Sequence, residues 1–343
     1  MDRYISLHEK INGPGDARPT AEQILKDEDL IGKLTGKTVL ITGGTAGLGT
    51  ESARVLRQTG AQVWITARNK AKGEEVAKSI SNDGKSYPAV KVVEIDLSDL
   101  NSVRKGAKAF LKECPKLNIL MTNAGVMACP EARSAQNFEL QFATNHLAHF
   151  LLFQLLKPAL LAASSPSSPS RVISLSSAGH RGSSIHPDNY NLENGVYAPF
   201  VAYGQSKTAN ILMANEIERR YGSKGLHAWS VHPGVIFETG ISRHQEGEAD
   251  GLRERLTQVD ADTVKVMKST GQGAATQVWA AVGKALEGKG GKYLEDCQVS
   301  RQMIPRAEGR PSFYGHEEYI YDVELAGRLW RDSCEMVGVE DRD

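Results

Sequence analysis

Cysteine is scarce in this sequence, and its spacing excludes two kinds of stabilised site. The four cysteines, Cys114, Cys129, Cys297 and Cys334, show neither CxxC nor CxxxC spacing. A structural zinc site or a disulfide framework draws on closely or regularly spaced cysteines, so neither is expected. We predict a protein without a bound metal, in a reducing compartment.

An excess of either charge and a long apolar run are also missing. Lysine plus arginine total 41 and aspartate plus glutamate total 41, so the chain has no long-range attraction for nucleic acid or an acidic membrane. The first ten residues, MDRYISLHEK, contain no apolar signal region, and no run of 18 apolar residues occurs. These absences predict a cytoplasmic protein with no membrane anchor and no nucleic-acid partner.

Short apolar runs alternate with longer segments of helical period along the 343 residues. The runs are nearly continuous and rich in β-branched residues, as in strands buried on both faces of a parallel sheet. The predicted strands are residues 38–42, 62–66, 90–95, 117–122, 171–175 and 227–231. Repetition of this unit predicts an α/β fold with a doubly wound parallel sheet and helices on both faces.

Residues 1–35 are predicted to be a lead-in rather than a domain. They contain one short helix, in which Thr20 with Gln23 three residues later forms a capping-box pattern. Residues 36–343 are expected to form a single domain. Segments of about 178–202 and 235–270 are expected to cover the substrate, and about 295–343 to form a C-terminal extension.

A glycine-rich turn, TGGTAGLG, follows the first predicted strand and begins a helix. Gly43, Gly47 and Gly49 there permit a tight turn, close approach of a pyrophosphate and helix-on-strand packing, while the helix N-terminus supplies amide donors. Many such turns are glycine-rich for steric reasons only. The strand, turn and helix context favours a dinucleotide.

Further motifs follow in a fixed order. They are Asp96 after the third strand, Asn123-Ala124-Gly125 after the fourth, Asn145 in a long helix, SLSS after the fifth, YGQSK at 203–207, and His232-Pro233-Gly234 after the sixth. Over roughly residues 36–300 this order resembles the short-chain dehydrogenase/reductase superfamily, in its retinol-dehydrogenase and WW-domain-oxidoreductase-like branch. The first 36 residues lack the paired tryptophans of a WW domain. The resemblance implies a Rossmann-type sheet of about seven strands in the order 3-2-1-4-5-6-7.

The YGQSK motif places Tyr203 and Lys207 on one helical face. A surface pair is the ordinary interpretation, but the surrounding motifs favour a catalytic one. A free tyrosine titrates near pH 10, so a neighbouring cation is expected to lower its pKa. The resemblance implies that Tyr203 transfers the proton and that Lys207 also holds the nicotinamide ribose. It further implies that Ser177, rather than Ser176, binds the substrate oxygen, and that Asn145 holds a water bonded to the lysine.

His146 and His149 flank Asn145. No carboxylate or third ligand lies at zinc spacing nearby, so they are expected to be packing or helix-interface residues rather than metal ligands.

The choice of nucleotide depends on the end of the second strand. Family members that bind NAD place an acid there, whereas this chain has Ala67 followed by Arg68. An arginine can bind a 2′-phosphate, so NADP(H) is predicted. Stacking of Arg68 on adenine would instead leave either cofactor acceptable. Asp96 is expected to meet the adenine amino group. As the first acid of DLSDL it could also cap the following helix, and the two roles are compatible. The predicted cofactor-binding residues are Gly43, Thr45, Gly47, Leu48, Gly49, Arg68, Asp96, Leu97, Asn123, Ala124, Gly125, Tyr203, Lys207, Pro233, Gly234 and Ile236.

One position departs from the family pattern. A threonine usually lies four residues after the glycine of the PG motif, whereas this chain has Glu238 there and Thr239 one residue later. A reshaped loop is therefore expected. Ile236 still lies where an apolar side chain would press on the nicotinamide ring.

The predicted function is NADP(H)-dependent oxidoreduction of a carbonyl or alcohol group on an apolar or aromatic small molecule, in either direction. Four aromatic residues of the loops, Tyr190, Tyr197, Phe200 and Phe237, could line the substrate site or pin the loops to the core. A non-redox cyclase or isomerase and a non-catalytic interaction module remain as alternatives. Monomer and homodimer both stay open, because helices around 137–161 and 200–221 form dimer contacts in many relatives while the tail could cover them.

Overall fold

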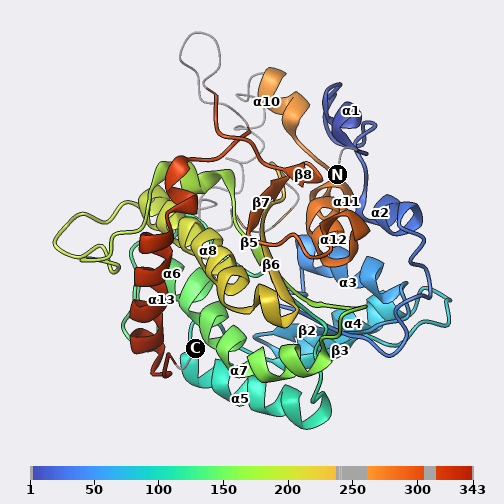
Figure 1. Ribbon diagram of the computed structural model, residues 1–343, viewed down its shortest axis with the longest axis horizontal. Helices are drawn as coiled ribbons and strands as arrows, with labels where there is room; N and C mark the ends of the chain where they lie inside the picture. The colour runs from blue at the N-terminus through green and yellow to red at the C-terminus, as the bar shows by residue number, and fades with distance from the viewer. Residues whose placement is uncertain (1–2, 237–238, 240, 242–260, 305–313, 342–343) are drawn as a thin grey trace.

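The computed structural model describes residues 3–236, 239, 241, 261–304 and 314–341. Over these residues the chain forms an eight-stranded sheet in the order β3-β2-β1-β4-β5-β6-β7-β8 (Figure 1). The strands are β1 (Thr38–Ile41), β2 (Gln62–Ala67), β3 (Lys91–Glu94), β4 (Ile119–Thr122), β5 (Ser170–Leu175), β6 (Leu226–His232), β7 (Lys292–Glu295) and β8 (Gln298–Val299). The first seven pair in parallel and in the predicted order, so the Rossmann-type fold is confirmed.

The eighth strand was not predicted. It pairs antiparallel with β7 across a two-residue turn, Asp296 and Cys297, whose φ angles are 52° and 54°. Two left-handed residues in succession mark the type I′ turn of tight hairpins, which usually carries an Asn-Gly or Asp-Gly pair. This turn contains no glycine, so no hairpin signal marks it in the sequence.

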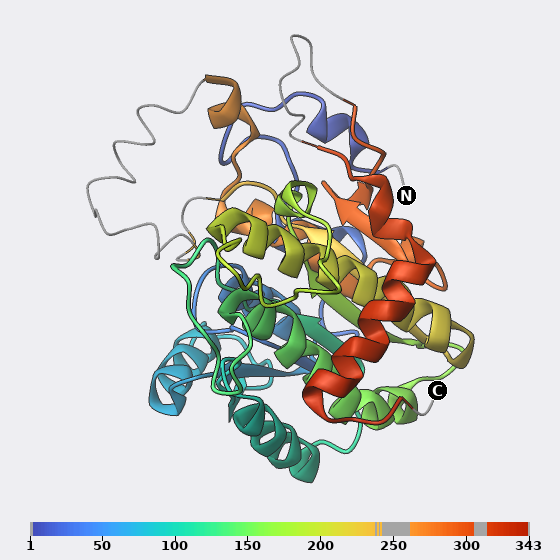
Figure 2. The same ribbon diagram turned by 90° about the vertical axis from the view of Figure 1, so that its left-hand side faces the viewer.

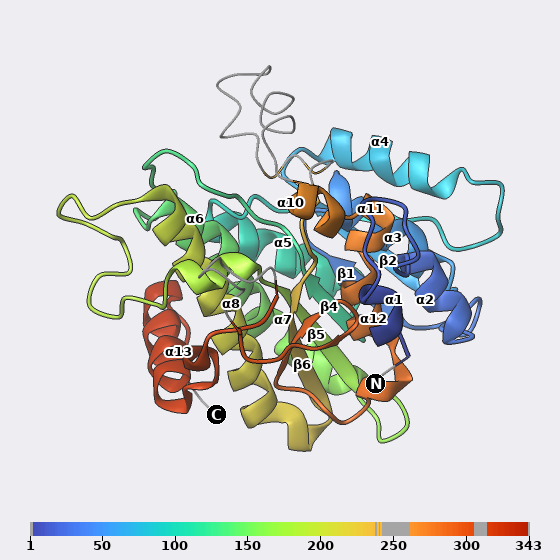
Figure 3. The ribbon, with the colours of Figure 1, turned by 90° about the horizontal axis from the view of Figure 1, so that it is seen from above.

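Helices cover both faces of the sheet, as Figure 3 shows from above. They are α1 (Ile5–His8), α2 (Ala21–Asp27), α3 (Gly47–Arg57), α4 (Lys70–Ser81), α5 (Leu100–Glu113), α6 (Leu140–Phe142), α7 (Ala148–Ala163), α8 (Pro199–Tyr221), α10 (Ala261–Val266), α11 (Thr270–Gly273), α12 (Ala275–Val282) and α13 (Val323–Val337). A π-helix, Ala143–Leu147, joins α6 to α7, and 3-10 turns lie at Ala178–Gly182, Gly222–Lys224, Lys284–Leu286 and Glu318–Tyr321.

Each face of the sheet has its own apolar core. Leu40 of β1 faces α5, α7, α8 and α13, while its neighbours Val39 and Ile41 face α2, α3, α4 and α12. Successive strand residues point to opposite faces, so a strand covered on both sides must be apolar throughout. This requirement explains the continuous apolar runs of the sequence.

The C-terminal helix α13 packs across α8 and α7 (Figure 2). Trp330 of α13 is buried, with ring centroids 5.0 Å from Phe150 and 6.0 Å from Phe153, and the guanidinium of Arg220 lies 4.7 Å from its ring. The outer side of the two long helices is therefore covered by the chain's own tail.

The segment before β1 contains two helices, α1 and α2, rather than the predicted one. Thr20 caps α2 as predicted, because its hydroxyl accepts a hydrogen bond from the backbone of Gln23 at 3.2 Å. Ile24 and Leu25 of α2 are buried in the core that contains α3 and α12.

Within the described residues, one helical stretch, Leu140–Ala163, is long and apolar enough to cross a membrane. Of its most apolar window, 61% is buried inside the fold, which suits a core helix.

Candidate active site

The predicted motifs gather at one edge of the sheet. The glycine-rich turn follows β1, Asn123 follows β4, Ser177 follows β5 and Pro233 follows β6. These four strands are parallel neighbours, so their carboxyl ends meet along a single edge. In open α/β sheets this edge is where ligands bind.

The turn after β1 requires glycine at three places. Gly43 and Gly47 have φ angles of 67° and 54°, a region that other residues rarely adopt. A Cβ on Gly49 would lie 2.7 Å from Asn123 Nδ2 and closer still to the Gly43 carbonyl. Ala46, at the N-cap of α3, gives the helix no side-chain cap, so its first amide groups are available to an anion.

A hollow of about 410 Å³ opens at this turn. Its lining includes Thr45, Gly47, Glu51, Ile80 and Thr270. Of the residues predicted to hold the cofactor at this turn, Thr45 and Gly47 therefore border open space.

Asn123 and Ala124 tie this turn to the end of β4. Asn123 Nδ2 donates to the Thr42 carbonyl at 2.9 Å, and the Ala124 amide donates to Thr42 Oγ1 at 3.0 Å. Both residues thus have a structural role beside any contact with a nucleotide.

Gly125 is the point where two of the predicted catalytic residues meet. A Cβ there would lie 3.2 Å from Asn145 Oδ1 and 3.4 Å from Lys207 Nζ. Asn145 Oδ1 accepts from the Val126 amide at 2.8 Å, while its Nδ2 donates to the Val126 carbonyl and to Ser206 Oγ, both at 2.9 Å. Hydrogen bonds therefore hold both the oxygen and the nitrogen of the Asn145 side-chain amide.

Asn145 lies in the π-helix Ala143–Leu147, a local widening often found at functional sites. His149 bridges this turn to β1, because its Nδ1 lies 2.8 Å from the Asn145 carbonyl and its Nε2 lies 2.9 Å from Thr42 Oγ1. The Asn145 carbonyl can only accept, so the histidine proton is on Nδ1, and Nε2 accepts from the Thr42 hydroxyl. Burial lowers the pKa of His149 to about 4, which keeps the ring neutral.

The sequence suggested packing roles for His146 and His149 and missed these bonds. His146 is also buried, and its Nε2 lies 2.9 Å from Ser333 Oγ on α13. Within the described part of the chain, no three His, Cys, Asp or Glu side chains gather where they could hold a metal.

Tyr203 and Lys207 lie one turn apart on α8, and both are buried. Lys207 Nζ lies 5.6 Å from the tyrosine ring centroid and donates to the Leu175 carbonyl at 3.1 Å. A Cβ on Gly179 would lie 2.6 Å from Tyr203 Cε1, so the ring packs directly on that glycine. Ser177 Oγ accepts from the Gly179 amide at 3.0 Å and bonds to the tyrosine. Ser176 instead donates to the Lys207 carbonyl, the structural role predicted for it.

The pKa of Tyr203 does not follow the predicted direction. Burial raises the pKa of Tyr203 to about 12, against a lowering by the hydrogen bond with Ser177. Burial also lowers the pKa of Lys207 to about 8. In this structure desolvation of the phenolate outweighs the hydrogen bond with Ser177, so the pKa of Tyr203 lies above its ordinary value.

Arg68 is exposed directly after β2, whereas Ala67 is buried. A Cβ on Gly73 would lie 2.7 Å from the Ala67 Cβ, so the alanine faces α4 and not the open edge. The side chain of Asn69 caps α4 by accepting from the Lys72 amide at 3.0 Å.

Asp96 does not cap the following helix. Its Oδ1 accepts from the Ser98 amide at 2.9 Å and the Ser98 hydroxyl at 2.7 Å, and Asp99 caps α5 instead. Leu97 beside it is buried. The helix-cap role suggested for Asp96 is therefore wrong, because the helix begins three residues later than that role requires.

After β6 the chain returns to the glycine-rich turn. A Cβ on Gly273 would lie 2.6 Å from Ile236 Cγ1 and 2.9 Å from Leu48 Cδ2, so these two predicted residues are close. Thr239 donates to the Ile236 carbonyl at 3.3 Å, and a Cβ on Gly47 would lie 3.1 Å from its methyl group. Thr239 thus lies against the phosphate-binding turn, while Glu238 lies outside the described residues.

Two of the loop aromatics pin their loop to the body of the protein. Tyr190 stacks on Phe142 at 5.0 Å and donates to Asp332 at 2.8 Å, and Tyr197 donates to the Cys129 carbonyl at 2.8 Å. Phe200, at the start of α8, is 64% exposed. Phe237 lies outside the described residues.

Comparison with known proteins gives matches over most of the chain. Residues 37–249 match the profile of the family described as short chain dehydrogenase. An oxidoreductase of Penicillium decumbens, calI, is 51% identical over 343 residues, which are 99% of each chain. Retinol dehydrogenase 12 of Mus musculus is 38% identical over 308 residues, 90% of this chain and 88% of its own. The solved structure of an uncharacterized protein from Mycobacterium paratuberculosis has a TM-score of 0.67 and 30% identity, and covers 91% of this chain and 97% of its own.

Proposed function

The chain belongs to the short-chain dehydrogenase/reductase family, in its retinol-dehydrogenase-like branch, and on this premise we propose an NADP(H)-dependent oxidoreductase of carbonyl or alcohol groups. The proposed substrate is an apolar or aromatic small molecule. The observation that carries the proposal is the meeting of Lys207 and Asn145 at Gly125, with Tyr203 one turn before the lysine on α8. Ser177 Oγ and the Tyr203 ring both lie beside Gly179.

The residues at the strand ends fit a dinucleotide. The uncapped amides of α3 and the glycines before them would hold its pyrophosphate, and Arg68 would meet a 2′-phosphate. Lys207 would hold the nicotinamide ribose, and Ile236 would press on the ring. When bound, the nicotinamide supplies or accepts the hydride.

The chain's own groups then manage the proton. The raised pKa of Tyr203, about 12, keeps its hydroxyl protonated at neutral pH, so it is ready to donate to a carbonyl oxygen. Ser177 bonds to that tyrosine and would orient the same oxygen. Lys207, with a pKa of about 8, still carries its charge at pH 7 and would stabilise the phenolate that forms.

The test is direct. The protein is mixed with NADPH or NADH and a panel of ketones, aldehydes and quinones, and loss of nicotinamide absorbance is followed together with product. Consumption of NADPH with one product per nicotinamide supports the proposal. A panel of relevant carbonyls that leaves both nicotinamides unchanged while the nucleotide binds contradicts it.

A non-redox cyclase or isomerase on the same fold is the second candidate. It would use the nucleotide as a scaffold and give product with no net change in nicotinamide. An interaction module would give no product at all. The presence of all four groups, Asn145, Ser177, Tyr203 and Lys207, favours the redox proposal over both.

We also propose that the protein is a monomer. The faces of α7 and α8 that could pair with a second copy are covered by α13, through Trp330 above all.

A further inference from the structure

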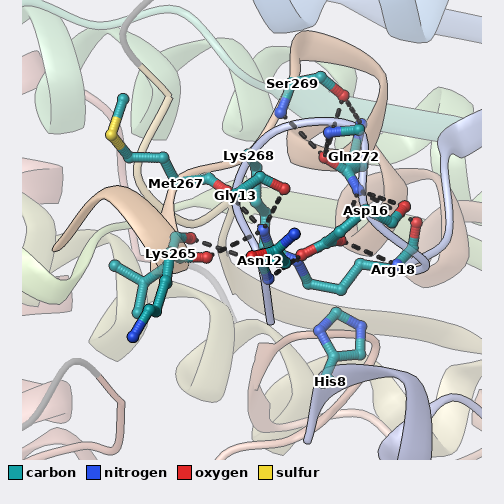
Figure 4. A network of polar contacts seen from close by, with 12 residues as sticks. His8, Asn12, Gly13, Asp16, Arg18, Lys265, Met267, Lys268, Ser269 and Gln272 are labelled. Atoms are coloured by element: carbon teal, nitrogen blue, oxygen red, sulfur yellow. Dashed lines mark hydrogen bonds and ion pairs between the residues drawn. The ribbon is translucent and has the colours of Figure 1, made fainter. Parts of the chain in front are cut away.

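The first residues of the chain pack against residues 265–272, about 250 positions away (Figure 4). The guanidinium of Arg18 is buried and donates to the carbonyl groups of Val266 at 2.9 Å and Met267 at 2.5 Å. Asp16 pairs with Arg18 at 2.8 Å and accepts from Gln272 Nε2 at 2.9 Å. The N-terminal segment therefore holds the chain where it returns from the segment after β6.

Lys268, at the end of this returning stretch, contacts the turn after β6 in three ways. Its amide donates to the Val235 carbonyl at 2.9 Å, and its Nζ donates to the Pro233 carbonyl at 3.3 Å. Gly234 has a φ angle of 100°, and a Cβ there would lie 2.8 Å from Lys268 Cδ. Lys268 therefore contacts three successive residues of the turn, Pro233, Gly234 and Val235.

The charge of Lys268 is balanced inside the fold. Its Nζ lies 2.5 Å from Asp296 Oδ1, and both side chains are nearly fully buried. His8 Nδ1 of the N-terminal segment lies 3.5 Å from the same carboxylate oxygen. Although burial would raise the pKa of Asp296, the charge of Lys268 lowers it below its ordinary value, so the carboxylate is ionised. Removal of one partner leaves the other charge buried and uncompensated.

These contacts reach the serine turn as well. The ring of His232, directly before Pro233, accepts from the Ala178 amide at 3.2 Å, next to Ser177. Burial, followed by the charge of Lys268, lowers the pKa of His232 to about 3, so its Nδ1 stays free to accept. A shift of the Pro233 turn would therefore also disturb the residue after the catalytic serine.

We propose that Lys268 and Asp296, held by the N-terminal segment 8–18, are positioning residues for the nicotinamide half of the site. They act through the turn Pro233–Ile236, whose last side chain lies beside Leu48 of the glycine-rich helix. Lys268, Asp296 and residues 8–18 all lie outside residues 37–249, the part that matches the family profile. This inference rests on the proposed function, because it takes the ring of a nicotinamide to lie on Ile236.

The test compares Lys268→Met with Lys265→Met. Methionine retains the stem under Gly234 but removes the ammonium group, and Lys265 is an exposed control three residues away on the same stretch. Two nucleotides are titrated: NADPH, and adenosine 2′,5′-bisphosphate, which has the phosphate end but no nicotinamide. Amide hydrogen exchange of residues 232–236 is measured without any nucleotide.

Lys268→Met is expected to weaken NADPH binding at least tenfold, leave the bisphosphate within twofold, and speed exchange at 232–236, while Lys265→Met changes none of these. Equal weakening of both nucleotides, or no weakening of either, overturns the inference. If the wild type binds neither nucleotide, the proposed function fails, and the exchange result then decides the inference: faster exchange in Lys268→Met supports it and unchanged exchange overturns it. If Lys268→Met does not fold, the same measurements are made on Asp296→Asn, which keeps the shape of the side chain. The same results support or overturn the inference.

Discussion

The imidazole of His149 joins Asn145 to Thr42, with Nδ1 at 2.8 Å from the asparagine carbonyl and Nε2 at 2.9 Å from the threonine hydroxyl. Thr42 directly follows β1, and its hydroxyl oxygen accepts from the Ala124 amide, so one neutral ring connects three parts of the candidate site. The histidine touches no reacting group in this arrangement. It acts by fixing the π-helix that carries Asn145.

Replacement of His149 should therefore lower turnover without a matching loss of cofactor affinity. His149→Leu removes both bonds, and we expect kcat to fall about tenfold, the value of roughly one hydrogen bond of about 1.4 kcal/mol. His149→Asn keeps an N–H donor near the Asn145 carbonyl and should recover most of the rate. Steady-state kinetics and NADPH titration of both variants check this. Equal rates in the two variants would show that the ring only fills space.

Tyr203→Phe removes one oxygen and keeps the ring packed on Gly179. Turnover should fall by about 10²- to 10⁴-fold, as for the loss of a general acid, while NADPH affinity stays nearly unchanged. Lys207→Ala should lower turnover and affinity together, because the same side chain serves both. Product and nicotinamide are measured in parallel. Wild-type rates in the phenylalanine variant would exclude Tyr203 as the proton donor.

Arg68→Ala should separate the two nucleotides. Loss of a charge-assisted bond to the 2′-phosphate should weaken NADPH binding by about 1.5 to 3 kcal/mol and affect NADH much less. Lys78→Ala, at an exposed lysine in the last turn of α4, is the control. Equal losses for NADPH and NADH would assign Arg68 to stacking on adenine. Ala67→Asp, which would restore the acid of NAD-binding family members, is not a suitable test, because Ala67 is buried against Gly73.

Acid should destabilise the protein well above the pH at which ordinary carboxylates titrate. Burial lowers the pKa of His146 and His232 to about 3 and of His149 and His180 to about 4. The unfolded chain takes up these protons first, near pH 6.5, so stability is complete above that value and is lost as pH falls toward 4. Each histidine should lower the free energy of unfolding by about 1 to 2 kcal/mol as the pH falls from 7 to 5. Glu295 acts in the opposite direction, because burial raises its pKa to about 7.

Urea unfolding at pH 7, 6 and 5 measures the balance of these groups. Burial also lowers the pKa of His8 to about 4 and raises the pKa of Glu139, so two carboxyl groups offset part of the effect of five histidines. We expect the midpoint to fall with pH, and to fall less steeply in His149→Asn. A midpoint that is constant or higher at pH 5 would contradict the assignment of neutral, buried rings.

The C-terminal helix should keep the protein monomeric. Sedimentation of the wild type should give 37.3 kDa, and Trp330→Ala should lose about 3 to 5 kcal/mol of stability and expose an apolar face that self-associates. Val323→Ala, at an exposed position of the same helix, is the control. A dimeric wild type would show that another surface pairs the chains.

Local patterns predicted the buried strands and the shared helical face of Tyr203 and Lys207, whereas the sheet order and the catalytic roles came from the resemblance to the short-chain dehydrogenase/reductase superfamily. Continuous apolar runs mark buried parallel strands, and Tyr203 and Lys207 share a helical face at any four-residue spacing. The four-residue spacing does not indicate how deeply the two side chains are buried. Burial of Tyr203 decides its pKa, and burial depends on which distant segments cover α8.

The missed features join segments that are far apart in the sequence. β8 depends on a turn at Asp296 that lacks glycine, and Lys268 has no motif around it. His149 looked like a core residue because the bond to Thr42 spans 107 positions. No short window of sequence contains both partners of such a bond.

The bond between His146 and Ser333 spans 187 positions and ends on α13. The ribosome makes α13 after α7 and α8, so the wall behind Asn145 is not yet closed when Tyr203, Lys207 and the whole glycine-rich turn have been made. A nascent chain at that stage exposes the apolar flank of α7 and α8 to chaperones and to other nascent chains. The order of synthesis therefore leaves this flank open until α13 has been made and packs on it.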